Sequence, residues 1–329
     1  MAKSALICGI SGQDGSLLAK HLLSLGYRVA GTSRDGDMVR GANLDRLGIR
    51  DQVTIHSMAT ADFRSIIQTL DQLEIDELYN LSGQSSVGLS FDQPVETMDS
   101  IGGATLTLLE AIRFLGRPMR FYNAGSSECF GDIGDVPATE DTPFRPRSPY
   151  AVAKATAHWT VANYREAYGL FACSGILFNH ESPLRPERFV TQKIVRGAAD
   201  IAAGRADTLV LGNLDIWRDW GWAPEYVEAM HLILQQDSPD DYIIATGRTT
   251  SLEAFVATVF EEYGLDWRRH VTTHPGLIRP SDLRYSAASP AKAADRLGWK
   301  AATGAGDVAR RMAAAQREGA IWPRETGID

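Results

Sequence analysis

Residues 5–15 read ALICGISGQDG, and this short stretch decides the fold of the chain. Its first four residues, Ala5–Cys8, are apolar and predict a buried strand, and the glycine-rich segment Gly9–Gly15 follows at once. A helical pattern of leucines comes next and stops at Gly26. Glycine permits a tight turn and lets backbone N–H groups approach a pyrophosphate at a helix N-terminus. The strand–turn–helix order therefore predicts a dinucleotide-binding turn. The residues expected to hold the dinucleotide there are Gly9, Gly12, Gln13, Asp14 and Gly15.

The same alternation of short apolar runs with longer amphipathic ones continues through the first half of the chain. It predicts an α/β fold, a Rossmann-like doubly wound parallel sheet with helices on both faces. After about Asn179 the sequence becomes irregular and richer in Arg, Pro and Trp, which indicates a smaller, interleaved C-terminal substrate lobe. We expect the dinucleotide domain to span 1–178 with returning segments at about 212–247, and the substrate lobe to span about 179–211 and 248–329. The expected strands are Ala5–Cys8, Tyr27–Thr32, Val53–His56, Glu77–Leu81, Met119–Ala124 and Phe171–Phe178.

Composition narrows the class of protein. The chain has 329 residues and a formal charge of -8, which argues against binding to nucleic acid or to a membrane surface. No stretch approaches the roughly 18 apolar residues of a membrane span, and the N-terminus does not resemble a signal peptide. The three scattered cysteines form neither a disulfide framework nor a metal motif. We therefore expect a cytoplasmic enzyme without a metal.

Tyr150 and Lys154 stand one helical turn apart, directly after a proline-rich segment, Asp132–Pro149. That segment predicts a long loop over the carboxyl edge of the sheet, where ligands bind in such folds. The pKa of a free phenol is about 10, and a neighbouring ammonium and a cationic nicotinamide favour the phenolate. Tyr150 could then take the proton of an alcohol while a hydride leaves for the nicotinamide, a contribution of about 10²–10⁴-fold.

Ser126 and Glu128 follow the fifth expected strand, and so should lie beside the nicotinamide. The Ser126 hydroxyl can hydrogen-bond the reacting oxygen. Glu128 supplies an acid/base that alcohol oxidation alone does not need. Once C4 of a hexose is a ketone, the proton on C5 becomes acidic, and a carboxylate can remove it and help to expel the C6 hydroxyl as water. The combination predicts oxidation, elimination of water and reduction of a sugar.

The choice between dinucleotides depends on the end of the second expected strand. Arg34 there favours the 2′-phosphate of NADP. Asp35 and Asp37 would repel that phosphate and keep NAD open. We expect NADP.

These residues together resemble those of the extended short-chain dehydrogenase/reductase superfamily, and within it the GDP-mannose 4,6-dehydratase family, over nearly the whole chain. The most specific matches are the string Asn179–Pro183, which follows Phe178, and the string Arg218–Gly221. The others are Gly9–Gly15, Tyr79–Leu81, Gln84-Ser85, Ser126–Glu128, Pro146–Tyr150 with Lys154, and Tyr226–Met230.

The resemblance implies a two-lobed enzyme that forms a homodimer or homotetramer, recycles NADP within each turnover and produces GDP-4-keto-6-deoxymannose. By position, it makes Glu128 the dehydration acid/base, Tyr150 the redox base and Lys154 its partner, with Ser126 where the family usually has Thr. It also implies cofactor contacts at Leu81, Gln84, Ser85, His180 and Arg185, and a GDP-sugar pocket made by Ser85, Asn179, Lys193, Arg218 and Arg279. The three cations of that pocket suit a diphosphate.

The departures from the family concern mainly the adenosine end of the cofactor. The family has an Arg pair after the second strand and a Gly-Asp pair after the third, where this chain has Arg34-Asp35 and Met58-Ala59. Trp217, Trp222 and Arg284 also differ. Three other readings stay open: a dehydratase of a variant sugar such as a GDP-heptose, a sugar-nucleotide epimerase or 4-ketoreductase, and a non-catalytic dinucleotide-sensing protein. Glu128 counts against the epimerase or ketoreductase, which would not need it.

Overall fold

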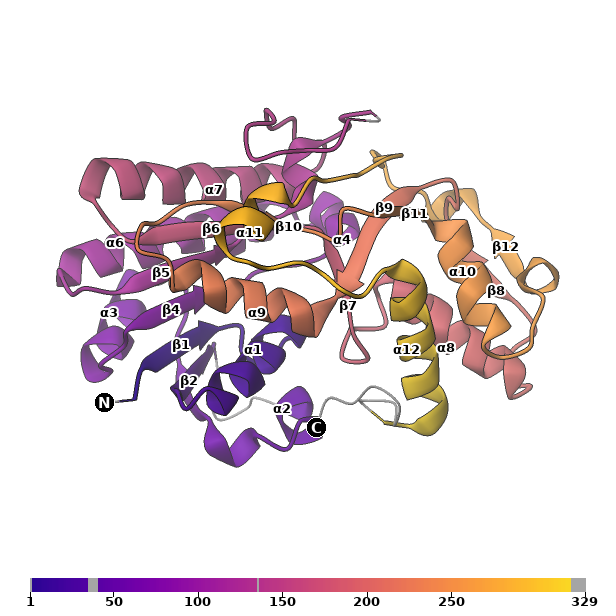
Figure 1. Cartoon of the computed structure of the whole chain (residues 1–329), viewed down its shortest axis with the longest axis horizontal. Helices are drawn as coiled ribbons and strands as arrows, with labels where there is room; N and C mark the ends of the chain where they lie inside the picture. Colours follow the sequence, from indigo (N-terminus) through magenta and orange to yellow (C-terminus); the bar gives the residue numbers. More distant parts are fainter. Residues whose placement is uncertain (1, 35–40, 135, 321–329) are drawn as a thin grey trace.

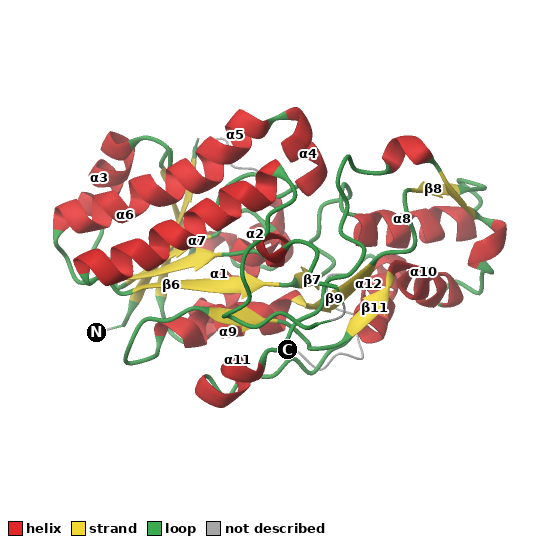
Figure 2. Ribbon diagram, turned by 90° about the horizontal axis from the view of Figure 1, so that it is seen from above, coloured by secondary structure: helices red, strands yellow, loops and turns green. Residues whose placement is uncertain are grey.

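The computed structural model describes residues 2–34, 41–134 and 136–320. It contains a large sheet covered by helices and a second group of helices beside it (Figures 1 and 2). The strands are β1 Ser4–Cys8, β2 Arg28–Ser33, β3 Thr54–Ser57, β4 Glu77–Asn80, β5 Arg120–Ala124, β6 Ala172–Leu177, β7 Asn179–Glu181, β8 Leu209–Leu211, β9 Trp217–Trp222, β10 Tyr242–Ile244, β11 Thr249–Ser251 and β12 Val271–Thr273. The α-helices are α1 Gln13–Ser24, α2 Ala42–Arg46, α3 Phe63–Gln72, α4 Val87–Asp92, α5 Pro94–Met98, α6 Ala104–Leu115, α7 Pro149–Tyr168, α8 Val190–Ala202, α9 Ala223–Leu234, α10 Leu252–Glu261, α11 Ala291–Arg296 and α12 Ala305–Glu318.

The large sheet has seven parallel strands in the order β10-β6-β5-β4-β1-β2-β3. Alternate residues of each strand enter different cores, as the two-residue period of a strand requires. Leu6 and Leu78 pack beneath α3, α6 and α7, whereas Ile7 and Tyr79 pack beneath α1 and α9. This confirms the predicted doubly wound fold with helices on both faces (Figure 1). The leucine pattern is shorter than expected, because α1 ends at Ser24 and the side chain of Leu25 is exposed.

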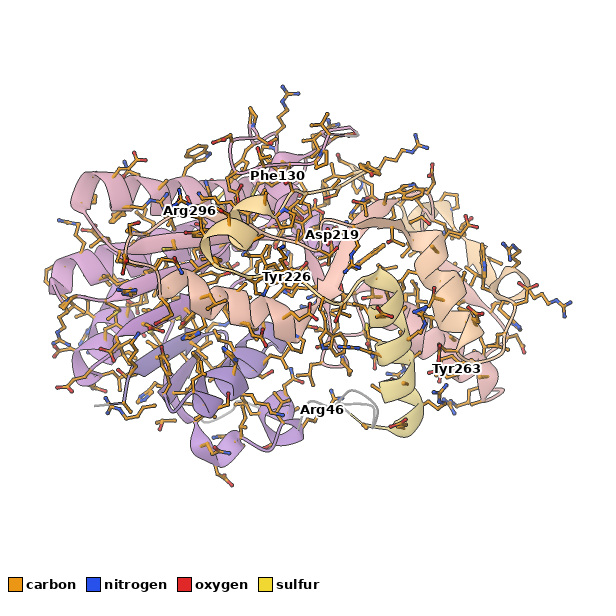
Figure 3. All side chains as sticks on the ribbon, in the orientation of Figure 1. Arg46, Phe130, Asp219, Tyr226, Tyr263 and Arg296 are labelled. Atoms are coloured by element: carbon orange, nitrogen blue, oxygen red, sulfur yellow. The ribbon has the colours of Figure 1, made fainter. Side chains whose placement is uncertain are left out.

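A second hydrophobic core lies between α8, α10 and α12, with β9 packed against α12. Of the predicted returning segment 212–247, β10 joins the large sheet, whereas β9 pairs with β7 and β11 in a separate three-stranded sheet. The buried Trp220 of β9 belongs to this second core. Asp219 and Tyr226, where β9 runs into α9, lie near the centre of the molecule (Figure 3). The division of the chain into two domains stays a prediction.

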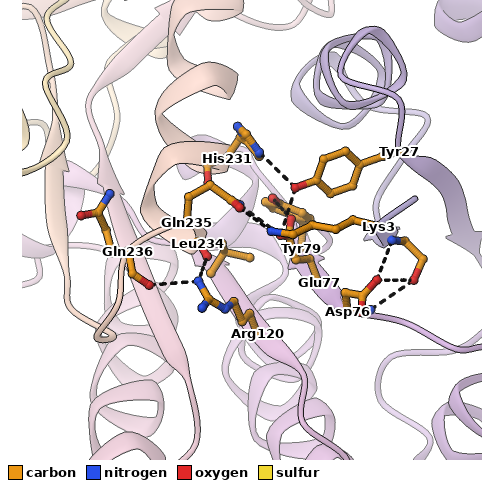
Figure 4. Close-up of polar contacts among 11 residues, drawn as sticks. Lys3, Tyr27, Asp76, Glu77, Tyr79, Arg120, His231, Leu234, Gln235 and Gln236 are labelled. Carbon is orange, nitrogen blue, oxygen red and sulfur yellow. Dashed lines mark hydrogen bonds and ion pairs between the residues drawn. The ribbon is translucent and has the colours of Figure 1, made fainter. Parts of the chain in front are cut away.

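A buried polar cluster joins α9 to the amino edge of the sheet (Figure 4). Glu77 at the start of β4 accepts hydrogen bonds from Tyr27 at 3.1 Å, Tyr79 at 2.8 Å and Gln235 at 3.0 Å. The Tyr27 hydroxyl also lies 3.1 Å from Nε2 of His231. Polar groups thus satisfy each other at this edge. Within the described residues, no helix is both long and apolar enough to cross a membrane.

Candidate active site

A cavity of about 430 Å³ opens at the carboxyl edge of the sheet, between the sheet and the second group of helices. Side chains from loops after β4, β5 and β6 form one wall, and residues of α8 and β9 form the other. Most of the residues predicted for cofactor, substrate and catalysis line it together. These are Asp14, Leu81, Gln84, Ser85, Ser126, Glu128, Tyr150, Lys154, Asn179, His180, Arg185, Lys193, Arg218 and Arg279.

Apart from Asp14, the residues predicted in the glycine-rich turn do not line this cavity, and neither does Arg34. Gly9 has a φ of 85°, and a Cβ there would lie 2.7 Å from the carbonyl oxygen of Leu81, so only glycine fits between the turn and β4. Gly12 and Gly15 complete the turn. Gln13 is buried and braces β7, because its side chain donates to the carbonyl of His180 at 3.2 Å. The residues predicted for the dinucleotide that lie outside the cavity are Gly9, Gly12, Gln13, Gly15 and Arg34.

Arg34 itself is exposed and lies 4.0 Å from the carboxylate of Glu96. Asp35 and Asp37, which bear on the choice between NADP and NAD, lie outside the described residues. Ala59, the other departure at the adenosine end, donates its backbone N–H to Ser65 at 3.0 Å. Met58 beside it is buried under the sheet.

Tyr150 and Lys154 lie in the first two turns of α7. Ser148 caps this helix by accepting from the backbone N–H of Ala151 at 3.1 Å, and Pro149 begins it, which aims the first turn at the end of β5. Lys154 donates to the carbonyl of Ala124 at 2.7 Å, and its Nζ lies 5.8 Å from the centre of the Tyr150 ring. The described part of the predicted loop, Asp132–Pro149, contains no helix or strand before Pro149.

Burial dominates the acid–base properties of this pair. It raises the pKa of Tyr150, while a hydrogen bond from Ser126 opposes the rise. Burial also lowers the pKa of Lys154 to about 8, against the opposing effect of Cys129 and Asp14. The phenol is therefore protonated at neutral pH, and a cation close to its oxygen is needed before it can act as a base.

Ser126 and Glu128 lie where β5 runs into a short 3-10 helix, Ser127–Phe130. Ser126 caps that helix by accepting from the N–H of Glu128 at 3.3 Å. Burial raises the pKa of the Glu128 carboxyl, and the nearby guanidiniums of Arg218 and Arg279 oppose the rise. A carboxyl whose pKa is raised in this way is a better base than an ordinary glutamate and, once protonated, can return the proton.

His180 and Arg185 form two buried ion pairs beside the glycine-rich turn. His180 lies 3.0 Å from Asp14 and stacks on Tyr226, with ring centres 4.6 Å apart. Burial alone would lower the pKa of His180, but the Asp14 carboxylate outweighs burial and raises this pKa above its ordinary value. Arg185 pairs with Glu181 at 3.1 Å. These residues place an imidazole and a guanidinium, each beside a carboxylate, next to the expected position of the dinucleotide.

Three predicted cations lie at the end of the cavity formed by α8, β9 and the segment after β12, and two of them, Arg218 and Arg279, also lie near Glu128. Arg218 is buried and lies 3.3 Å from Asp282, which is also 3.7 Å from Arg279. The Nζ of Lys193 donates to the carbonyl of Val210 at 2.7 Å. Two of the three cations therefore share one carboxylate, so this end of the cavity has an excess of positive charge that suits a diphosphate.

The other positions at which this chain departs from the family, Trp217, Trp222 and Arg284, do not line the cavity. Trp222 is buried in β9, with Arg311 over its ring at 5.3 Å. Trp217 is exposed and packs one face near Tyr285, with ring centres 6.3 Å apart, and Arg284 pairs with Asp215 at the surface.

Two functional candidates escaped the sequence reasoning, Asp282 and Arg188. Asp282 is brought to Arg218 only by the fold, since 64 residues separate them. Arg188 lines the cavity and donates to Ser85 at 3.2 Å. The sequence does indicate Arg188, because it lies in the segment directly after Asn179–Pro183, three residues beyond Arg185, which was predicted to contact the cofactor.

Comparison with known proteins identifies the family. The model of the family described as GDP-mannose 4,6 dehydratase matches residues 6–312. The chain belongs to the GDP-mannose 4,6-dehydratase family. GDP-mannose 4,6 dehydratase 1 of Arabidopsis thaliana is 44% identical over 312 residues, which are 92% of this chain and 86% of that protein. GDP-mannose 4,6-dehydratase of Vibrio cholerae is 42% identical over 91% of this chain and 90% of its own.

Solved structures agree on the fold of this dehydratase-family chain. DesIV, a dTDP-glucose 4,6-dehydratase from Streptomyces venezuelae with NAD and TYD bound, has a TM-score of 0.85 at 21% identity, over 96% of this chain and 97% of its own. A UDP-glucose 4-epimerase from Thermus thermophilus, in complex with NAD, has a TM-score of 0.84 at 25% identity, over 95% of this chain and 99% of its own.

Proposed function

We propose that this protein is a GDP-mannose 4,6-dehydratase, a lyase that converts GDP-mannose into GDP-4-keto-6-deoxymannose. The observation that carries the proposal is Glu128, which lines the same cavity as Ser126, Tyr150 and Lys154. Family membership supports the substrate, and the cationic end of the cavity suits its diphosphate.

In the first half-reaction Tyr150 would remove the proton of the C4 hydroxyl, and Ser126, which lines the same cavity, would hold that oxygen. A bound nicotinamide dinucleotide would accept the hydride from C4 and later return it to C6. Glu128 would take the acidic proton from C5 and deliver a proton to the C6 hydroxyl, which leaves as water. Hydride return to C6 then requires a proton at C5, and this uptake balances the proton that Tyr150 removed from the C4 hydroxyl. Tyr150 and Glu128 thus act on different carbons, which fits their origin on different elements, α7 and the end of β5.

We propose NADP as the dinucleotide. The residues of this chain fit such a group: the tight turn at Gly9 lies between β1 and α1, and His180 and Arg185 lie beside it. Arg34 is exposed and would face the 2′-phosphate. Chromatography of the nucleotide released from denatured protein tests this assignment, and recovery of NAD in place of NADP would overturn it.

The decisive experiment for the reaction incubates the purified protein with GDP-mannose and follows the loss of water by mass spectrometry. GDP-heptoses are tested in parallel, because the same catalytic groups would dehydrate them. If none of these sugars gives a 4-keto-6-deoxy product with either cofactor, the proposed function is wrong.

We further propose a homodimer or homotetramer in a reducing, cytoplasmic compartment. The outer face of α6 and α7 exposes Leu106, Val152 and Trp159, with exposed fractions of 48%, 41% and 60%. Apolar side chains grouped in this way are typical of protein–protein interfaces. The double substitution Leu106→Glu and Trp159→Glu should reduce the molar mass measured by light scattering, and an unchanged mass would place the interface elsewhere.

The cysteines are buried and unpaired, in keeping with a reducing compartment.

A further inference from the structure

Arg188 crosses the cavity between its two walls. It belongs to the segment that leads into α8, whereas its hydrogen-bond partner Ser85 belongs to the loop after β4. The guanidinium donates to the Ser85 hydroxyl at 3.2 Å and lies 5.1 Å from the centre of the Phe189 ring. Arg188 is exposed to solvent and lines the cavity, so its guanidinium faces a ligand bound on this side.

The charge of Arg188 is not matched by a carboxylate. Within the described residues, none lies within ion-pair distance of it, and the adjacent Glu187 pairs with Arg196 instead. The other arginines of the cavity are engaged, since Arg185 faces Glu181 and Arg218 faces Asp282. A guanidinium has five N–H donors, so most of the hydrogen-bonding capacity of Arg188 remains available to a ligand.

The position of Ser85 shows which part of a ligand Arg188 would meet. β4 and β5 are neighbouring strands, and Ser85 follows β4 as Ser126 and Glu128 follow β5. Ser85 therefore lies at the same sheet edge as the reacting groups. Lys193, Arg218 and Arg279, which we assign to the diphosphate, come from other segments of the chain, although Arg218 and Arg279 also lie near Glu128.

We propose that Arg188 is a specificity-determining residue that binds the C2 and C3 hydroxyls of the hexose. The inference rests on the proposed function, in which the C4 hydroxyl meets Tyr150 and the C6 hydroxyl leaves past Glu128. The remaining ring hydroxyls are those on C2 and C3. Arg188, on the segment that leads into α8, is the donor placed to bind them from the wall opposite the sheet edge. In binding them, Arg188 exchanges its hydrogen bond to Ser85 for bonds to the sugar, and so aligns C4 with the catalytic groups.

The test compares the binding of GDP and GDP-mannose by calorimetry. The protein carries Tyr150→Phe, so that the sugar stays unconverted, and is studied with and without Arg188→Ala. The substitution should weaken GDP-mannose binding about 10- to 100-fold, the loss expected for hydrogen bonds from a charged donor, and leave GDP binding unchanged. GDP-mannose analogues that lack the C2 or the C3 hydroxyl should bind more weakly only while Arg188 is present.

Arg205→Ala is the matched control, because Arg205 is exposed beyond the end of α8 and pairs with Asp200. Arg188→Lys keeps the charge without the planar fork and should recover only part of the lost affinity. Equal weakening of GDP and GDP-mannose would assign Arg188 to the diphosphate and overturn the proposal, as would no weakening, or loss of bound dinucleotide alone. Preferential binding of GDP-mannose without any dehydrated product from the unsubstituted protein would refute the proposed function but leave the role of Arg188 standing.

Discussion

Substitution of Glu128 by Gln separates the redox steps from the elimination. Gln has the same shape as Glu, and its oxygen can still accept hydrogen bonds, but it can neither take the C5 proton nor protonate the leaving hydroxyl. Ser126 keeps its position, because it accepts from the backbone N–H of Glu128, which the substitution leaves in place. Tyr150 and Lys154 belong to α7, where Lys154 is held by the carbonyl of Ala124.

The size of the effect follows from the role and the surroundings of Glu128. A positioned acid/base contributes about 10²–10⁴-fold, so kcat should fall by that factor, a rise in the barrier of roughly 3–5 kcal/mol. Substrate binding should not weaken. Arg218 keeps Asp282 at 3.3 Å, and loss of a negative charge leaves the cavity more favourable for a diphosphate.

The assay follows two signals after GDP-mannose is added. Dehydrated product, measured by mass spectrometry, should form far more slowly than in the unsubstituted enzyme. The near-ultraviolet absorbance of reduced nicotinamide should still appear and should persist, because oxidation at C4 continues while elimination stalls. Glu140→Gln is the matched control, since Glu140 accepts from the backbone N–H of Ile243 and does not line the cavity. Product formation at the normal rate by Glu128→Gln would refute the role given to this carboxylate.

Three further predictions concern pH and packing. Burial lowers the pKa of Lys154 to about 8, so its ammonium is lost above that pH. We therefore expect kcat/KM to fall as pH rises through about 8. A profile that stays flat to about pH 10, where an unperturbed lysine titrates, would contradict this role. Burial, and to a smaller extent the nearby His231, lowers the pKa of His21 to about 4. The ordinary pKa of a histidine is about 6.5, so between these two values the folded state binds fewer protons than the unfolded state. Stability should therefore decrease as pH falls through this window, and thermal melts of His21→Gln should show a weaker pH dependence if the assignment is right. A Cβ on Gly221 would overlap the ring of Tyr226, so Gly221→Ala should cost about 1–3 kcal/mol in denaturant unfolding, and an unchanged midpoint would show that the ring can move aside.

Local sequence was enough to predict the elements that carry the chemistry. The run Ala5–Cys8 and the glycines after it make a strand and a turn whatever lies elsewhere, since the constraints are the apolar run and the steric freedom of glycine. The spacing of Tyr150 and Lys154 likewise places both on adjacent turns of one helix. Because parallel strands end at one edge, the meeting of Ser126, Glu128 and Tyr150 there could also be anticipated.

Tertiary structure alone decided the contacts between segments distant in sequence. Arg188 meets Ser85 across 103 residues, and Arg218 meets Asp282 across 64, and no local pattern signals either pair. It also decided that β9 leaves the large sheet for a separate one, because Trp220 gains burial in the second core. The catalytic residues could thus be recognised from short stretches of sequence, because the conformation of each stretch depends mainly on neighbouring residues. The balance of charge in the cavity depends on how the large sheet packs against the second group of helices. The contact of Arg188 with Ser85 across the cavity depends on the same packing.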